Sequence, residues 1–239
     1  MTSDRAVTVG TLKVLSAGAV KSGVARRAAD FEKARGCRVE LEFAIGPKVR
    51  ERVLAGEAVD VVVAPPAAMD EFARQGRIDA ATRALVGRSR VGVFVRTGRP
   101  LPDISSADAF KQAVLKADAL VYNKASSGIY IGKLLERLGI AEAIRDKVIL
   151  VESGSAVMQT VATDPRGTLG VGQISEIRVQ IDKGTAITFA GPLPDAIQNI
   201  TTYDAAVATA SHAPDAAAAF VSFLTSVEGR QVFAATGID

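Results

Sequence analysis

A short loop near the start of the chain carries the first pattern that could do chemistry. The largely apolar run at 12–15 ends at Ser16, which is followed by Ala17 and Gly18. A helix that begins at such a point has backbone N–H groups with no partner inside the helix, next to a side-chain hydroxyl. We therefore predict that Ser16, Ala17 and Gly18 bind an anion without using a charged side chain.

Further loops that follow predicted strands are also rich in glycine and hydroxyl residues. They are Ile45-Gly46-Pro47, Asn123-Lys124-Ala125-Ser126-Ser127-Gly128, Ser153-Gly154-Ser155-Ala156 and Gly172-Gln173-Ile174-Ser175. A single loop of this kind more often only caps a helix. In open α/β sheets, however, ligands bind outside the carboxyl ends of the strands, so the whole set favours an anion site. The candidate ligand-binding residues from these loops are Gly46, Ser126, Ser127, Gly128, Ser155 and Gln173.

Charged residues near these loops could complete the site. Ser126 and Ser127 precede a predicted helix whose positive dipole end would favour a negative charge, and Lys124 could add a full charge there. Arg88 lies where the chain is predicted to pass between two lobes, and its forked guanidinium could bind a carboxylate. A solvated surface arginine is the equal alternative for Arg88.

The sequence does not identify catalytic residues. Glu152 and Glu176 are the carboxylates nearest the predicted loops, and we interpret each as a surface or hinge residue. Cys37 is the only cysteine and His212 the only histidine, which excludes an intramolecular disulfide and a zinc site built from Cys and His. We expect no metal and no other cofactor.

Composition limits the possible partners. The chain has 239 residues, 48% of them hydrophobic, and 29 basic against 26 acidic residues give a net charge of only +3. This field is too weak for a nucleic-acid binder. No run of about 20 apolar residues predicts direct membrane insertion, and no signal peptide is recognisable at the start. The protein is thus expected to be periplasmic if a leader has been removed, and cytoplasmic if the sequence is complete as written.

Short apolar runs alternate with helical patterns, which predicts an α/β fold with mostly parallel strands. We predict strands at 12–15, 38–43, 59–64, 89–96, 119–122, 148–151, 168–172 and 201–210, with an extended segment at 187–193. The predicted helices include 106–116, 129–138, 156–162, 214–224 and 227–235. We expect two lobes: residues 1–90 with 205–239, which hold both termini, and residues 91–204, each a sheet flanked by helices.

The order of these elements resembles the periplasmic molybdate-binding proteins of ABC transporters, in the type 2 solute-binding superfamily. The most specific stretches are Leu54-Ala55-Gly56-Glu57-Ala58-Val59-Asp60-Val61-Val62-Val63 and the C-terminal Phe220-Val221-Ser222-Phe223-Leu224. The resemblance implies a two-lobed type 2 periplasmic-binding-protein fold with two hinge crossings, which closes on an anion by hinge bending. It also implies a monomer that delivers a small anionic ligand to an ABC transporter membrane permease.

Two positions depart from this family's pattern. Ser16 matches its first serine, but Ala44-Ile45-Gly46-Pro47 has no hydroxyl where the family usually has a Ser-Ser-Gly-like turn, and Gln173 lies near a position where the family often has tyrosine. A dry oxyanion site cannot simply lose a polar ligand group. We therefore expect an organic di- or tricarboxylate in preference to molybdate.

Two functions remain open at this point. The chain is expected to be the substrate-binding component of an ABC-type importer. The alternative follows from a divergent branch of the superfamily that resembles aconitate isomerase: a cofactor-independent isomerase that shifts a proton in a tricarboxylate. Such an enzyme would need Arg or Lys clamps and one base.

Overall fold

The computed structural model describes residues 10–239, except for the side chain of Ser126. The chain divides into two compact units. Unit 1 consists of Met1–Gly87 and Thr202–Ala235, and unit 2 of Arg88–Thr201 and Thr236–Asp239. None of the described helices is both long and apolar enough to cross a membrane.

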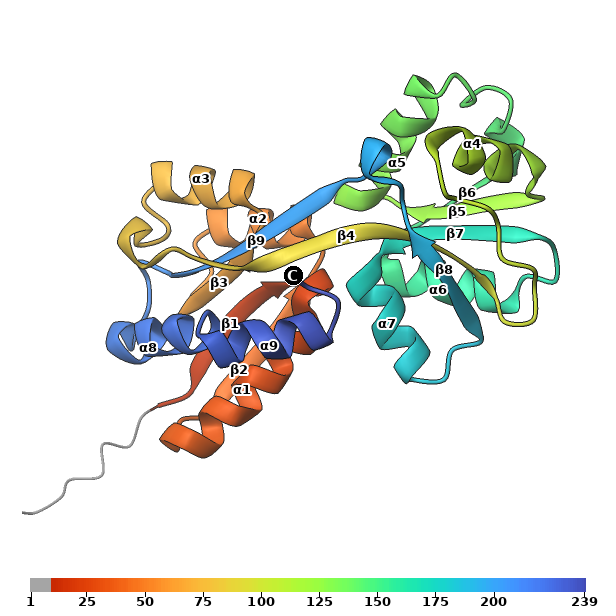
Figure 1. Cartoon of the computed structure of the whole chain (residues 1–239). Coiled ribbons are helices and arrows are strands. Elements are labelled where there is room, and N and C mark those ends of the chain that lie inside the picture. The colour runs from red at the N-terminus through yellow and green to blue at the C-terminus, as the bar shows by residue number, and fades with distance from the viewer. Residues whose placement is uncertain (1–9) are drawn as a thin grey trace, which may run out of the picture. The chain divides into compact units, whose positions relative to one another are not determined.

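Unit 1 is built on parallel strands with helices on both faces (Figure 1). Strand β1 (Leu12–Ala17) pairs in parallel with β2 (Val39–Ala44) and with β3 (Val61–Ala64), and β9 (Ile200–Val207) runs antiparallel to β3. Strand β1 lies between β2 and β3, and Ser16, its last residue but one, is opposite Phe43 on β2 and Val63 on β3. Strand β3 (VVVA) is entirely apolar and buried, as expected for a strand that is covered on both faces.

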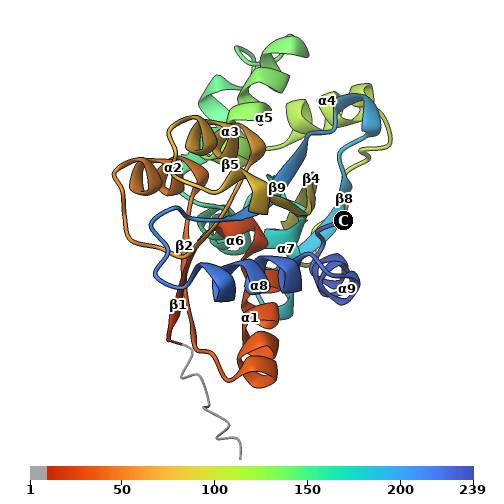
Figure 2. The same cartoon turned by 90° about the vertical axis from the view of Figure 1, so that its left-hand side faces the viewer.

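The helices of unit 1 form two groups, on opposite faces of its strands in both views (Figures 1 and 2). One group is α1 (Lys21–Arg35), α8 (Pro214–Leu224) and α9 (Val227–Ala235), and the other is α2 (Gly46–Leu54) and α3 (Pro66–Arg74). The ring of Phe31 on α1 packs edge-on against Phe220 of α8 at 5.1 Å between centroids. This contact attaches the C-terminal helices to the first helix of the chain.

Unit 2 has a mixed sheet. Strand β5 (Ala119–Asn123) is parallel to β6 (Val148–Val151) and β7 (Thr168–Gln173), whereas β4 (Ala84–Arg96) is antiparallel to β7 and β8 (Ile187–Pro192). Its helices are α4 (Ala107–Lys116), α5 (Ser126–Arg137), α6 (Gly154–Thr163) and α7 (Ile174–Asp182). The α/β fold predicted from the sequence is confirmed, with this antiparallel pairing added to the parallel strands.

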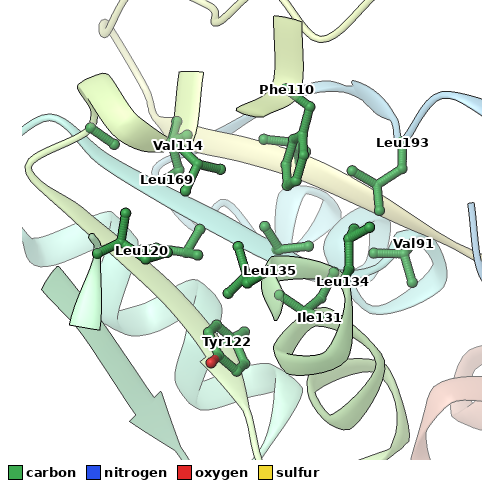
Figure 3. Close-up of a cluster of buried hydrophobic side chains, with 14 of the residues drawn as sticks. Val91, Phe110, Val114, Leu120, Tyr122, Ile131, Leu134, Leu135, Leu169 and Leu193 are labelled. Carbon is green, nitrogen blue, oxygen red and sulfur yellow. The ribbon is translucent and has the colours of Figure 1, made fainter. Parts of the chain in front are cut away.

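One core of unit 2 lies between its sheet and the helices α4 and α5 (Figure 3). Phe110 and Val114 of α4 and Ile131 and Leu134 of α5 are all buried in it. These side chains recur every three or four residues, so each helix directs one apolar face to the sheet. The packing fixes the start of α5 relative to the end of β5.

The structure differs from the predicted elements in three places that concern the site. Strand β1 continues through Ser16 and Ala17, so the helical turn begins only at Gly18. Helix α5 begins at Ser126 and not at 129. Helix α7 was not predicted, because it is only nine residues long and its start was interpreted as part of a loop.

Candidate functional site

The carboxyl ends of the parallel strands in each unit are followed at once by helix N-termini. In unit 1, β1, β2 and β3 lead into helical residues that begin at Gly18, Gly46 and Pro66. In unit 2, β5, β6 and β7 lead into helices that begin at Ser126, Gly154 and Ile174. Since parallel strands end at one edge of a sheet, each unit brings its three helix N-termini to a common edge.

The first loop of unit 1 offers backbone N–H groups and not a free hydroxyl. Ser16 is fully buried, and its Oγ donates a hydrogen bond to the carbonyl of Ala17 at 3.1 Å. Ala17 precedes a short 3₁₀ turn at Gly18–Val20 and gives it no side-chain cap. The first N–H groups of that turn have no partner within it. Gly18 lies close to the end of β2, with 3.8 Å between the position of an added Cβ and the oxygen of Ala44.

The second loop of unit 1 has the same character. Ile45 precedes α2 without a side-chain cap, and Gly46 is the first residue of the helix, followed by Pro47. An added Cβ on Gly46 would meet no atom within 4 Å, so the space beside this helix start is open within the part of the chain that the structure describes. The predicted residues Ser16, Ala17, Gly18 and Gly46 therefore lie at one edge of unit 1.

Helix α5 of unit 2 begins in a tightly packed turn. Asn123 is buried, and its Oδ1 accepts hydrogen bonds from the backbone N–H of Ala125 at 3.0 Å and from Ser127 Oγ at 3.5 Å. An added Cβ on Gly128 would lie 1.5 Å from the Asn123 carbonyl oxygen, so only glycine fits there. Ser127 is buried, and the side chain of Ser126 lies outside the described structure.

The charged residue of this turn is already paired. Lys124 forms an ion pair with Glu152, and both side chains are largely exposed. An exposed pair of this kind contributes little to stability. Lys124 is thus balanced by a carboxylate, so it does not bring a net positive charge to the start of α5.

Helix α6 shows capping where the sequence allowed either capping or ligand binding. Ser153 accepts a hydrogen bond from the N–H of Ala156 at 3.2 Å and so caps the helix. The predicted ligand-binding residue Ser155 is exposed, and its Oγ accepts a hydrogen bond from Gln180 Nε2 at 3.2 Å. The hydroxyls of Ser153 and Ser155 therefore form hydrogen bonds within the protein, and Gly154 is the first residue of the helix.

Gln173 lies at the end of β7, directly before α7. Its side chain is 2% exposed. Nε2 donates a hydrogen bond to Thr201 Oγ1 at 3.2 Å, whereas Oε1 has no hydrogen-bond partner among the described residues. Leaving a buried acceptor unpaired costs about 1–3 kcal/mol, so this oxygen would gain from a hydrogen-bond donor on a ligand.

Glu176, which the sequence analysis interpreted as a surface or hinge residue, has an unusual environment. It is half-buried on the first turn of α7, and an added Cβ on Gly154 would lie 2.0 Å from its Oε2. Burial raises the pKa of this carboxyl to about 7. The carboxyl is therefore poised to gain or lose a proton near neutral pH.

Arg88 is exposed, and only its backbone is fixed. Its N–H donates to the carbonyl of Asp239 at 2.6 Å and its carbonyl accepts from the N–H of Asp239 at 2.9 Å. Its guanidinium forms no ion pair or hydrogen bond with the residues that the structure describes, whereas the neighbouring Arg90 lies 3.7 Å from the Asp239 carboxylate. Of Arg88 and Arg90, only Arg88 has a guanidinium without a partner among the described residues.

No group of three or more His, Cys, Asp or Glu side chains among residues 10–239 could hold a metal ion. The strand ends of unit 1 present helix N-termini, and those of unit 2 present helix N-termini, hydroxyls, a buried amide and one carboxyl. Such an arrangement can bind an anion through N–H groups, and Glu176 could exchange a proton with it.

The sequence is similar to known proteins along most of its length. Residues 12–239 match the family described as bacterial extracellular solute-binding protein. An aconitate isomerase from Pseudomonas sp. is 30% identical over 238 residues, which cover 96% of this chain and 88% of the relative.

Two solved structures share the fold at low sequence identity. The periplasmic molybdate-binding protein of Azotobacter vinelandii superposes with a TM-score of 0.79 at 15% identity, covering 95% of this chain and 98% of the other. The substrate-binding domain of a putative molybdenum ABC transporter from Clostridium difficile gives 0.74 at 16% identity, with 95% and 97% covered. The fold expected from the sequence is therefore confirmed.

Proposed function

The chain belongs to the bacterial extracellular solute-binding protein family, and we propose that its solute is a small organic anion, a di- or tricarboxylate. As in the family at large, it would present this solute to the membrane permease of an ABC importer. Because the family is extracellular, we place this function outside the cytoplasm.

The observation that carries the proposal is the set of helix N-termini at the strand ends. The helical segments that start at Gly18, Gly46, Ser126 and Ile174 have no side-chain cap. The start of α3 after β3 is also uncapped, whereas the start of α6 after β6 is capped by Ser153. Within each unit, the uncapped N–H groups at the strand ends are free to bind an anion, and the helix dipoles favour its charge.

Two features favour an organic acid over a metal oxyanion. The start of α2 has no hydroxyl, so one ligand of a tetrahedral oxyanion would be absent. The buried Oε1 of Gln173 needs a donor, and a fully ionised oxyanion has only acceptors. A polycarboxylate that keeps a proton, or that carries a hydroxyl, could satisfy this oxygen.

A thermal-shift screen tests the proposal. The probes are cis-aconitate, trans-aconitate, citrate, succinate, sulfate, molybdate and tungstate, in a buffer that is neither a carboxylate nor a phosphate. A ligand at a hundred times its Kd adds about 2.7 kcal/mol to the stability of the folded state, which gives a clear shift. We expect a polycarboxylate to give the largest shift. Shifts from the oxyanions alone would contradict the proposal.

A second function, isomerisation of a tricarboxylate, is supported by the aconitate isomerase relative and by the proton-exchanging carboxyl of Glu176. In such a reaction a base removes a proton from a carbon beside a carboxylate and returns it to another carbon. Incubation of cis- or trans-aconitate with the protein in deuterated water distinguishes the two functions. Deuterium incorporation at carbon, followed by proton NMR, indicates the isomerase, and binding without exchange indicates the transport protein.

A further inference from the structure

We propose that Glu176 contacts the bound anion directly and, in its protonated form, donates a hydrogen bond to it. This inference rests on the proposed function and names a residue of that same site. Glu176 would thereby make the site selective for ligands that have a hydrogen-bond acceptor next to the start of α6.

The position of Glu176 is the first observation. Its carboxylate lies directly over Gly154, the first residue of α6, and occupies the space that any side chain at position 154 would need. Ser153 caps the N–H of Ala156, and the N–H groups of the residues before Ala156 in this first turn have no partner within the helix and are an attractive place for an anion. A ligand bound at the start of α6 would therefore lie next to the Glu176 carboxyl.

The elements with the most contacts to α7 carry no charge that could balance Glu176. They are α6, β7 and β8, with the sequences GSAVMQTVAT, TLGVGQ and ITFAGP; Ser89 of β4 and the C-terminal Gly237 also touch α7, at Ser175 and Arg178. None of the residues of α6, β7 and β8 titrates. On α7 itself, Arg178 and Asp182 are exposed.

In the adjoining segments, Arg88 next to Ser89 has no side-chain partner among the described residues, whereas two acidic groups are paired. Glu152 pairs with Lys124 before α6, and the C-terminal Asp239 lies near Arg90. No hydrogen bond or ion pair of the Glu176 carboxylate occurs among the residues that the structure describes. An unpaired, desolvated carboxyl favours its neutral form, and a nearby anion strengthens that preference.

Gln173 supplies an independent sign of a missing ligand. It is one helical turn before Glu176, and its buried Oε1 lacks a donor. The protonated carboxyl of Glu176 can donate a hydrogen bond, and Gln173 Oε1 can accept one. The two groups together therefore suit a ligand that has both an acceptor and a donor. Among the described residues, neither Gln173 Oε1 nor the Glu176 carboxylate has a hydrogen-bond partner.

Proton linkage makes the inference measurable. If the anion binds beside Glu176, the carboxyl takes up a proton on binding, because the anion disfavours the ionised form. Between the pKa values of the free and bound states, the Kd then rises up to tenfold per pH unit. Glu176→Gln resembles the protonated form and removes this dependence.

The experiment is calorimetric titration of the full chain with trans-aconitate at pH 6 to 8.5. Each titration uses two buffers of different ionisation enthalpy, neither a carboxylate nor a phosphate. We expect wild-type protein to take up a fraction of a proton per anion, with the largest uptake above pH 7. Glu176→Gln should bind with no such uptake and with little change of Kd across this range. The matched control is Glu152→Gln, since Glu152 lies on the adjacent loop but is paired with Lys124; it should take up the same fraction of a proton per anion as wild type, whatever its Kd.

The outcomes separate this inference from the proposed function. Binding of trans-aconitate without proton uptake, or uptake that persists in Glu176→Gln, overturns only the role of Glu176. Failure of every carboxylate to bind either protein overturns the proposed function and this inference with it. A carbon-13 NMR titration of the Glu176 carboxyl in the unliganded protein is a second measurement: a pKa near 4.5 would overturn the inference, and a pKa near 7 supports it.

Discussion

The carboxylate of Glu176 lies against the Cα of Gly154, so that the first residue of α6 has no room for a side chain while Glu176 remains in place. The two residues come from successive strand–helix connections of unit 2, after β6 and after β7. Their contact places a carboxyl that has no ion pair among the described residues beside the start of a helix.

Gly154→Ala is expected to displace the Glu176 carboxylate and leave the fold intact. The atom that the new Cβ would meet is the end of a flexible side chain, so it can rotate away. The displaced carboxylate becomes better solvated, and its pKa falls from about 7 towards 4.5. Carbon-13 NMR titration measures this fall. Gly132→Ala, a control on α5 where an added Cβ lies 4.0 Å from the Tyr122 hydroxyl, should leave the value unchanged.

The pH dependence of stability should also report Glu176. A carboxyl whose pKa is raised by folding stabilises the protein most below its unfolded value of 4.5, and this contribution is lost as the pH rises to about 7. The full loss corresponds to at most about 3 kcal/mol. The side chain at position 176 does not titrate in Glu176→Gln. We therefore expect the melting temperature of this variant to rise relative to that of wild type as the pH increases from 4.5 to 7. A gap that is constant over this range would show that the carboxyl is not desolvated.

Gly128→Ala should damage unit 2 severely. Here the added Cβ would lie 1.5 Å from the backbone oxygen of Asn123, which cannot move without shifting the end of β5. We expect a loss of roughly 2 kcal/mol or more in denaturant unfolding, as for other overpacked core sites. Gly132→Ala in the same helix should be neutral or slightly stabilising, because alanine is the better helix former. Equal stability of the two variants would contradict the packing described at the start of α5.

Arg88→Ala is expected to weaken the binding of a tricarboxylate at least tenfold, since its guanidinium is exposed and unpaired among the described residues. A charge-assisted hydrogen bond of about 1.5–3 kcal/mol corresponds to that loss. Arg145→Ala is the control, because Arg145 is 72% exposed and pairs with Glu142. Unchanged affinity in Arg88→Ala would remove Arg88 from the site.

The sequence was sufficient to predict most of the fold. Alternating apolar runs and helical faces located nearly every strand, and the loops that follow β1, β2, β5, β6 and β7 were correctly placed at strand ends. Helix α7 was not predicted, because its apolar positions Ile174, Ile177 and Ile181 are too few to stand out beside a glycine-rich loop. Missing this helix also hid the position of Glu176.

The roles of individual side chains were harder to predict. Ser16 was expected at a helix start, but its strand continues past it and buries its hydroxyl. The contact between Gly154 and Glu176 joins residues 22 positions apart, and nothing in the local sequence of either residue indicates it. Burial and pairing depend on packing between elements, which a single sequence does not reveal.

Calorimetric titration of the wild-type protein with trans-aconitate and with molybdate, side by side at pH 7, decides whether the solute is a polycarboxylate. We expect saturable binding of one trans-aconitate per chain and weak or undetectable binding of molybdate. Tight binding of molybdate with no binding of trans-aconitate would contradict this expectation.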